Sequence, residues 1–224
     1  MGQSTAAKKA HKVARKHAPI SYPRWQLLAK RVLDLLVSSI LLLLISPLLL
    51  FIALWIRMDS PGPVVFKQTR VGLHGKLYTI YKFRTMVTNA DELMKAKLAK
   101  LNSLEGFTFQ EKDDPRITPS GRFLRKLSFD ELPQLLNILK GDMSLVGPRP
   151  EVPDIVKLYN SEQHQRLHVL PGVTGLAQVN GRSELSLAET MAYDLEYVRK
   201  WSIGLDLQIL WKTIFVVLTG KGAY

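Results

Sequence analysis

A continuous apolar run, residues 35–56, is the strongest hydrophobic pattern in the chain. As a helix its 22 residues would be about 33 Å long, which is enough to cross a bilayer. Ser46-Pro47 lies near its middle, and a proline there removes a helix hydrogen bond and disfavours α geometry in the preceding residue. The run therefore predicts either a transmembrane helix or a re-entrant hairpin with arms 35–46 and 47–56.

The charges on both sides of this run favour the hairpin. Residues 1–31 contain eight Lys and Arg and no acid, and further basic residues follow from Arg57 onward. The positive-inside rule places both flanks in the cytoplasm, which a hairpin satisfies and a single span does not. We therefore expect a re-entrant hairpin over 30–58 and a domain over 59–224 on the cytoplasmic face of the membrane. Asp34 is expected to pair with Arg31 or Lys30, or to remain in interfacial water.

The formal net charge is +12, and the first 31 residues contribute eight of these charges. Beside a membrane segment, the basic tail 1–29 is predicted to contact anionic inner-leaflet phospholipid and not nucleic acid. A disordered tail that binds nothing is the alternative. The chain has no cysteine, which excludes disulfides, thiolate zinc sites and cysteine nucleophiles.

The remaining pattern predicts an α+β, mainly helical domain. Polar and apolar residues alternate around His74-Gly75, which predicts a β-hairpin of 64–71 with 76–83. Apolar residues recur at helical spacing, and further helices are predicted over 88–106, 120–126, 132–139, 154–165 and 187–200, followed by an amphipathic C-terminal helix. Trp201 and Trp211 fit either a membrane interface or core packing.

Two adjacent carboxylates, Asp130-Glu131, stand at the start of the helix predicted over 132–139. Pro133 suits the first turn and favours Asp130 as the N-cap, while Ser128 and Glu131 have the spacing of a capping box. The helix dipole and nearby basic residues are expected to keep the pKa of Asp130 low. An ionised Asp can attack phosphorus or hold Mg²⁺, and a plain surface helix cap is the alternative.

The segment Gly147-Pro148-Arg149-Pro150 favours phosphate chemistry over a plain helix cap. Pro150 confines Arg149 to an extended conformation, and a held guanidinium suits a bidentate phosphate contact. Lys82 and Arg84 at the end of the second strand are expected to add positive charge toward phosphate. Turns at three glycines could admit a nucleotide: Gly172, Gly175 and Gly181.

These segments together resemble the small monotopic phosphoglycosyl transferases, which are bacterial sugar transferases. The likeness covers nearly all of the chain from residue 30, and the block 127–151 is its most specific part. The matching segments are KRVLDLL (30–36) with Ser46-Pro47, VVFKQTRVG (64–72), IYKFRTM (80–86), DPRITPSGRFLRKLSFDELPQLLNILKGDMSLVGPRPE (114–151) and PGVTGLAQVNGR (171–182).

The resemblance implies a re-entrant membrane helix broken at Ser-Pro, with amphipathic interfacial helices around one catalytic domain. It implies transfer of a sugar 1-phosphate from a UDP-sugar to polyprenyl (undecaprenyl) phosphate at the bacterial inner membrane. This is the first membrane step of exopolysaccharide, O-antigen, capsule or glycoprotein glycan assembly. Asp130 matches the nucleophile, Glu131 supports it, and Mg²⁺ would lie near Asp130. The other positions expected to bind substrate are Lys82, Arg84, Arg125, Pro148, Arg149 and Pro150.

Two other functions fit the sequence less well. One is a non-catalytic membrane scaffold of a glycan-assembly complex, against which the intact Asp130, Glu131 and Arg149 argue. The other is a phosphohydrolase that cleaves the nucleotide sugar with water. The sequence leaves open the sugar and the oligomeric state.

Overall fold

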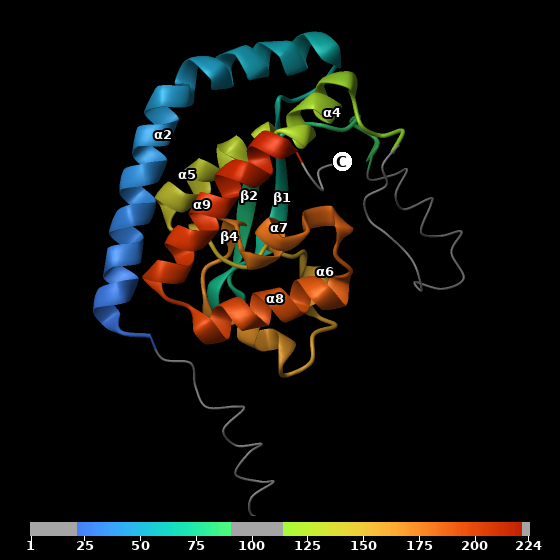
Figure 1. Ribbon diagram of the computed structural model, residues 1–224. Helices are drawn as coiled ribbons and strands as arrows, with labels where there is room; N and C mark the ends of the chain where they lie inside the picture. Colours follow the sequence, from blue (N-terminus) through green and yellow to red (C-terminus); the bar gives the residue numbers. More distant parts are fainter. Residues whose placement is uncertain (1–21, 91–113, 221–224) are drawn as a thin grey trace, which may run out of the picture.

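The computed structural model describes residues 22–90 and 114–220, and it shows a mainly helical domain built around a β-hairpin (Figure 1). Most of the predicted helix 88–106 and residues 1–21 of the predicted tail lie outside the described residues. In chain order the elements are α2 (Arg24–Asp59), β1 (Val65–Val71), η1 (Leu73–Gly75), β2 (Leu77–Phe83), α4 (Pro119–Lys126), η2 (Phe129–Gln134), α5 (Leu135–Lys140), β3 (Ser144–Val146), α6 (Pro153–Val156), η3 (Gln163–His168), β4 (Gly172–Thr174), α7 (Leu176–Asn180), η4 (Arg182–Glu184), α8 (Leu187–Lys200) and α9 (Ile203–Thr219), where η marks a 3₁₀ helix.

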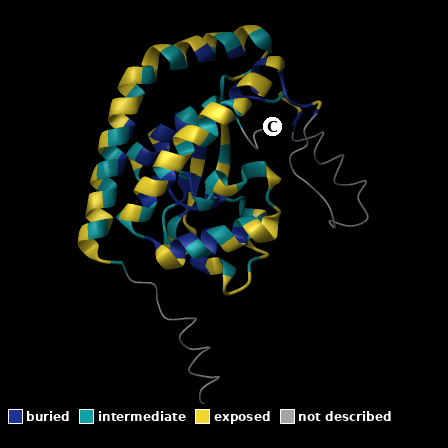
Figure 2. Cartoon of the chain, in the orientation of Figure 1, coloured by how far each residue is buried: buried dark blue, intermediate teal, exposed yellow. Residues whose placement is uncertain are grey.

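Helix α2 frames one side of the molecule and carries most of the exposed apolar surface. It is continuous over 36 residues with Pro47 inside it, and its direction changes near the middle (Figure 1). Its length and composition are those of a helix that could cross a membrane. Figure 2 shows that much of its surface is exposed, with large side chains such as Leu43, Leu44 and Phe51 more than 60% accessible.

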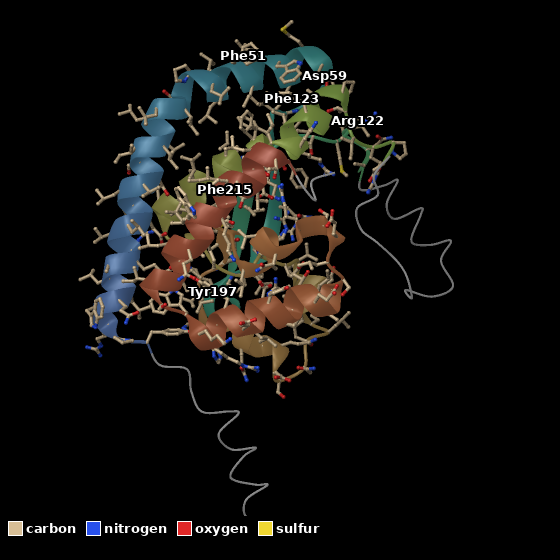
Figure 3. The ribbon with its side chains drawn as sticks, viewed as in Figure 1. Phe51, Asp59, Arg122, Phe123, Tyr197 and Phe215 are labelled. Carbon is tan, nitrogen blue, oxygen red and sulfur yellow. The ribbon has the colours of Figure 1, made fainter. Side chains whose placement is uncertain are left out.

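The N-terminal arm of α2 is fastened to the domain by a buried polar network. Lys30 Nζ lies 2.5 Å from Asp206 Oδ2, and it also donates to the carbonyl of Val146 at 3.0 Å. Tyr197 of α8 (Figure 3) donates to Asp206 Oδ1 at 2.8 Å. The predicted pairing of Asp34 with a basic neighbour is wrong, because this buried carboxylate accepts instead from Ser144 Oγ and from the backbone N–H of Leu145.

The C-terminal arm of α2 returns to the same domain. Ile52 and Ile56 are buried against Phe83 of β2 and Leu124 of α4. Phe123 of α4 lies below this arm in Figure 3, with its ring centroid 5.5 Å from that of Trp55. Asp59 Oδ2 accepts from Ser120 Oγ at 2.7 Å and from the Ser120 N–H at 3.2 Å. Both ends of α2 therefore dock on one domain.

The described part of the domain contains two small β-sheets, each of two strands. The predicted hairpin is confirmed, with β1 and β2 antiparallel and Val65 opposite Phe83. The second sheet is a parallel pair of β3 with β4. The sequence predicted turns over the segment of β4 and no element over that of β3. Its glycines permit close backbone approach, since a Cβ on Gly172 would lie 2.1 Å from the backbone nitrogen of Gly147.

The predicted helices have mixed outcomes. The helix over 187–200 is confirmed as α8, which begins with a capping box of Ser186 and Glu189, and the helix over 120–126 is confirmed within one residue as α4. The helix over 154–165 is wrong: only α6 and the separate 3₁₀ helix η3 form there. Asn160 and Gln163 exchange side-chain-to-backbone hydrogen bonds between those two, and such local bonds compete with helix propagation.

The C-terminal helix α9 separates the two tryptophans that the sequence left undecided. Trp201, just before it, is buried and donates from Nε1 to Asp206 at 3.1 Å. Trp211 is 64% exposed and stacks edge-on with Phe215, which is also exposed. Trp201 therefore packs in the core, and Trp211 belongs to an exposed apolar surface of α9.

The buried network gives a stability prediction. Asp206→Asn should lower the free energy of unfolding by about 3–5 kcal/mol, because it leaves Lys30 buried without its counter-charge. The matched control is Asp154→Asn, which breaks an exposed pair with Lys157 and should leave the unfolding midpoint unchanged. Denaturant unfolding in detergent micelles measures both variants, and equal midpoints would contradict the role given to Asp206.

Candidate active site

The turn η2 places the two adjacent carboxylates. Ser128 precedes it in the left-handed region at φ 58°, with no side-chain cap, so neither the predicted Asp130 N-cap nor the Ser128 capping box forms. Phe129 and Leu132 pack against the second arm of α2, while Asp130 and Glu131 lie within the first turn of η2. The helix predicted over 132–139 is confirmed only from residue 135. Helix α5 (Leu135–Lys140) follows η2 directly, with Gly141 as its C-cap.

Glu131 is held between two cations. Its Oε1 lies 3.0 Å from Lys82 Nζ and 3.0 Å from Arg149 NH2, and its side chain is 13% exposed. Asp130 differs: within residues 22–90 and 114–220 its carboxylate forms no hydrogen bond or ion pair. Adjacent residues thus present one neutralised acid and one acid that is available to a ligand.

The two carboxyl groups have pKa values shifted in opposite directions. Burial, together with the negative charge of Glu131, raises the pKa of Asp130 above its ordinary value. Burial also opposes ionisation of Glu131, but the charges and hydrogen bonds of Arg149 and Lys82 outweigh it and lower the pKa of Glu131. The predicted low pKa of Asp130 is therefore wrong, because burial and the charge of Glu131 outweigh the lowering effect of Lys82, Arg125 and Arg149.

The loop that carries Arg149 is fixed by hydrogen bonds that its backbone carbonyls accept from other parts of the domain. Arg166 NH2 donates to the carbonyl of Arg149 at 2.5 Å, and Arg70 NH1 donates to that of Pro150 at 3.0 Å. The carbonyl of Pro148 accepts from the Gly172 N–H at 2.9 Å. Both prolines are buried, so they shape the loop and hold Arg149, whose side chain is 39% exposed.

Two more arginines act on the carboxylates from other elements. Arg125 of α4 donates from Nε to Thr85 Oγ1 at 3.0 Å, and its charge acts on Asp130. Arg182 at the start of η4 donates from NH2 to Ser128 Oγ and acts electrostatically on Glu131 and Asp130. Arg182 was missed as a site residue, although it ends the quoted segment 171–182; the Gly-Arg step at a turn was its one local signal.

Arg84 does not join this cluster. It is buried, and its NH2 donates to the Ser60 carbonyl at 2.6 Å and to Ser60 Oγ at 2.9 Å, which closes the C-terminal end of α2. Its charged neighbours are Arg57 and Asp59. The structure therefore does not bring Arg84 together with Lys82, Arg149 and the acids, and its binding of substrate stays a prediction.

The predicted glycine turns do not form an open nucleotide site. A Cβ on Gly175 would lie 2.2 Å from the Gly147 carbonyl oxygen, and Gly172 meets the same loop. These glycines therefore bring the loop of Arg149 against β4. A hollow does exist on the other side of Arg149, lined by Arg70, Ile80, Lys82, Gln134, Arg149 and Pro150.

Comparison with known proteins gives one consistent result. A family model described as bacterial sugar transferase matches residues 25–220. The galactosyl transferase CpsE of Streptococcus agalactiae is 45% identical over 90% of this chain but is covered over only 45% of its own length. The undecaprenyl-phosphate galactose phosphotransferase of Salmonella typhimurium is 45% identical over 87% of this chain and 41% of its own length. The uncharacterized sugar transferase EpsL of Bacillus subtilis is 46% identical over 88% of this chain and 90% of its own length.

The site predicts separate effects for two arginines. Arg149→Gln should weaken binding of pyrophosphate, a two-phosphate probe, by about tenfold or more, since a charge-assisted contact is lost. Arg84→Gln should lower stability by about 1–3 kcal/mol through its lost bonds to Ser60, and leave pyrophosphate affinity unchanged. Calorimetry and thermal unfolding of both variants check this, and loss of affinity in Arg84→Gln would return Arg84 to the site.

Proposed function

This chain belongs to the bacterial sugar transferase family, and we propose that it transfers a sugar 1-phosphate from a UDP-sugar to undecaprenyl phosphate. The products are undecaprenyl-diphospho-sugar and UMP. The name of the Salmonella relative, which gives undecaprenyl phosphate as the acceptor, supports this proposal. The reaction would be the first membrane step in assembly of an exopolysaccharide or a related glycan.

Asp130 supplies the nucleophile. Its carboxylate attacks the β-phosphorus of the UDP-sugar, the bond from that phosphorus to the bridging oxygen breaks, and UMP leaves with the electron pair. The sugar phosphate is then held on Asp130 as an acyl phosphate. The observation that carries this proposal is the contrast between the neighbouring acids: Glu131 is paired with two cations, and Asp130 has no partner within the described residues.

The second step regenerates the enzyme. A phosphate oxygen of undecaprenyl phosphate attacks the same phosphorus, and Asp130 leaves as a carboxylate. The lowered pKa of Glu131 makes it a poor proton acceptor, so its role is to hold Lys82 and Arg149 beside the reacting phosphates. Fixed cations of this kind stabilise the charge that develops on a departing phosphate.

Mg²⁺ fits this site as a partner of the diphosphate. Proteins bind Mg²⁺ through one or two carboxylates together with substrate phosphates. The described residues contain no cluster of three or more His, Cys, Asp or Glu that could hold a metal alone, and the carboxylate of Asp130 has no partner among them. Asp130 is therefore the residue that would hold the ion. When bound, Mg²⁺ supplies charge neutralisation at the leaving phosphate.

The docking of both ends of α2 on one domain supports a re-entrant membrane element. The basic residues on both flanks support a domain on the cytoplasmic face. Lys30 and Asp34 near one end and Ile52, Ile56 and Asp59 near the other all contact the same domain. A straight helix of this length would separate its ends by about 54 Å, more than the hydrocarbon core of a bilayer. The change of direction near the middle of α2 (Figure 1) is what a re-entrant element needs to return the chain to the side from which it came.

A burst assay tests the covalent step. With a UDP-sugar, Mg²⁺ and no acceptor, the protein should release at most about one UMP per enzyme, because the phosphosugar stays on Asp130. Undecaprenyl phosphate should then allow turnover. Asp130→Asn should abolish the burst and the turnover while leaving membrane binding intact, and Asp154→Asn, on the exposed start of α6, is the matched control.

Continued UMP release without acceptor would mean that water takes the phosphosugar, and the protein would be a hydrolase. Absence of UMP with every UDP-sugar tested, by wild-type protein that binds membranes, would favour the scaffold.

Labelling of single cysteines tests the re-entrant element, because the chain has no cysteine of its own. Pro23→Cys lies just before α2 and Thr69→Cys lies on β1; both positions are exposed. A membrane-impermeant maleimide should label both in inverted membrane vesicles and neither in intact spheroplasts. Labelling of the two positions from opposite sides would show that α2 spans the bilayer.

A further inference from the structure

The direction of the Arg149 side chain depends on how its backbone is held. Within the described residues this side chain forms one ion pair, with Glu131, and it is 39% exposed. Two other arginines grip the loop behind it. Arg166 NH2 donates to the carbonyl of Arg149 at 2.5 Å, and Arg70 NH1 donates to that of Pro150 at 3.0 Å. A shift of either carbonyl would therefore turn the exposed guanidinium.

Arg166, in η3, is itself held by a buried carboxylate of α8. Its NH2 lies 2.7 Å from Asp194 Oδ2, and the two side chains are only 3% and 0% exposed. Its NH1 donates to the hydroxyl of Tyr159. Among residues 22–90 and 114–220, Arg166 is the one cation that forms an ion pair with Asp194. A single nitrogen of Arg166 thus bridges the carboxylate of α8 and the backbone of Arg149.

Stability alone does not account for this buried pair. Removing two charges from water offsets much of their attraction, and well-packed apolar residues of similar volume often stabilise a core equally well. The cost is visible in Asp194, because burial raises the pKa of this carboxyl to about 6 against the opposing charge of Arg166. Apolar residues would not supply a donor for the carbonyl of Arg149. A guanidinium fixed by a carboxylate does.

We propose that Asp194 and Arg166 are positioning residues of the active site, whose buried ion pair fixes the carbonyl of Arg149 and thereby aims its side chain at the substrate phosphate. This rests on the proposed function, which gives Arg149 a phosphate to bind. Neither residue contacts the substrate: Asp194 holds Arg166, and Arg166 holds the loop. Helix α8 thus reaches the reacting groups through two side chains and one carbonyl.

Replacing both members of the pair separates positioning from stability. Loss of one partner alone would leave a buried charge unpaired, so the variant combines Arg166→Met with Asp194→Leu. It should change the melting temperature by less than about 5 °C. The full chain in detergent micelles is then titrated with pyrophosphate and Mg²⁺ by calorimetry. Affinity should fall by about fivefold or more, because the loop loses its donor. Wild-type affinity in this variant would overturn the proposal.

A double-mutant cycle shows whether the pair acts through Arg149. The same paired replacement is made in the Arg149→Gln background, where no guanidinium remains to be aimed. There it should change pyrophosphate affinity by less than about twofold. A loss as large as that in the wild-type background would show a general effect on the fold, and would contradict positioning of Arg149.

The matched control lies on the same helix. Lys200→Gln breaks an exposed ion pair of α8 with Glu196 and should leave pyrophosphate affinity unchanged. If the paired variant does not fold, as judged by thermal unfolding, Asp194→Asn replaces it in the cycle. Asparagine keeps the shape and an acceptor oxygen but not the charge, so the expected loss is about threefold, and only where Arg149 is intact. No loss, or the same loss in both backgrounds, would overturn the proposal.

Two outcomes keep this proposal separate from the proposed function. If wild-type protein binds pyrophosphate but releases no UMP from any UDP-sugar, the transferase proposal fails, and the cycle still decides the role of Asp194 and Arg166. If wild-type protein does not bind pyrophosphate, the positioning proposal fails, and the UMP burst still decides the proposed function.

Discussion

The ion pairs of Glu131 with Lys82 and Arg149 organise the whole site. They join β2, η2 and the loop after β3, three elements far apart in the sequence. Glu131 pairs with both cations, and Asp130 has no partner within the described residues. Burial and the charge of Glu131 raise the pKa of Asp130. The turn that carries both acids packs against α2 through Phe129 and Leu132. The long apolar helix α2 and the turn that carries Asp130 are thus packed as one unit.

Local signals predicted much of the fold. The hairpin follows from alternation around a turn, and α8 from apolar residues at helical spacing, since both patterns are local. The pair of β3 with β4 was missed because its strands are three residues long and depend on glycine contacts between distant segments. The helix over 154–165 failed because side chains of Asn160 and Gln163 bond the backbone locally.

The site residues were predicted unevenly for the same reason. The acids, Lys82, Arg125 and Arg149 come together in space as the motifs suggested. The direction of an arginine side chain depends on partners from other elements. Arg84 turns to the end of α2 and Arg182 turns to Ser128, and neither choice is visible in the neighbouring sequence. The burial of Asp130 and the charge of the adjacent Glu131 were likewise missed, and together they reversed the expected pKa shift of Asp130.

The division of roles between the two acids can be measured directly. Protein loaded from a UDP-sugar without acceptor is treated with borohydride, which reduces an acyl phosphate to an alcohol, and the reduced residue is located by tandem mass spectrometry. The account predicts reduction at Asp130 alone. Reduction at Glu131, or turnover with undecaprenyl phosphate and no reducible group on either acid, would contradict it.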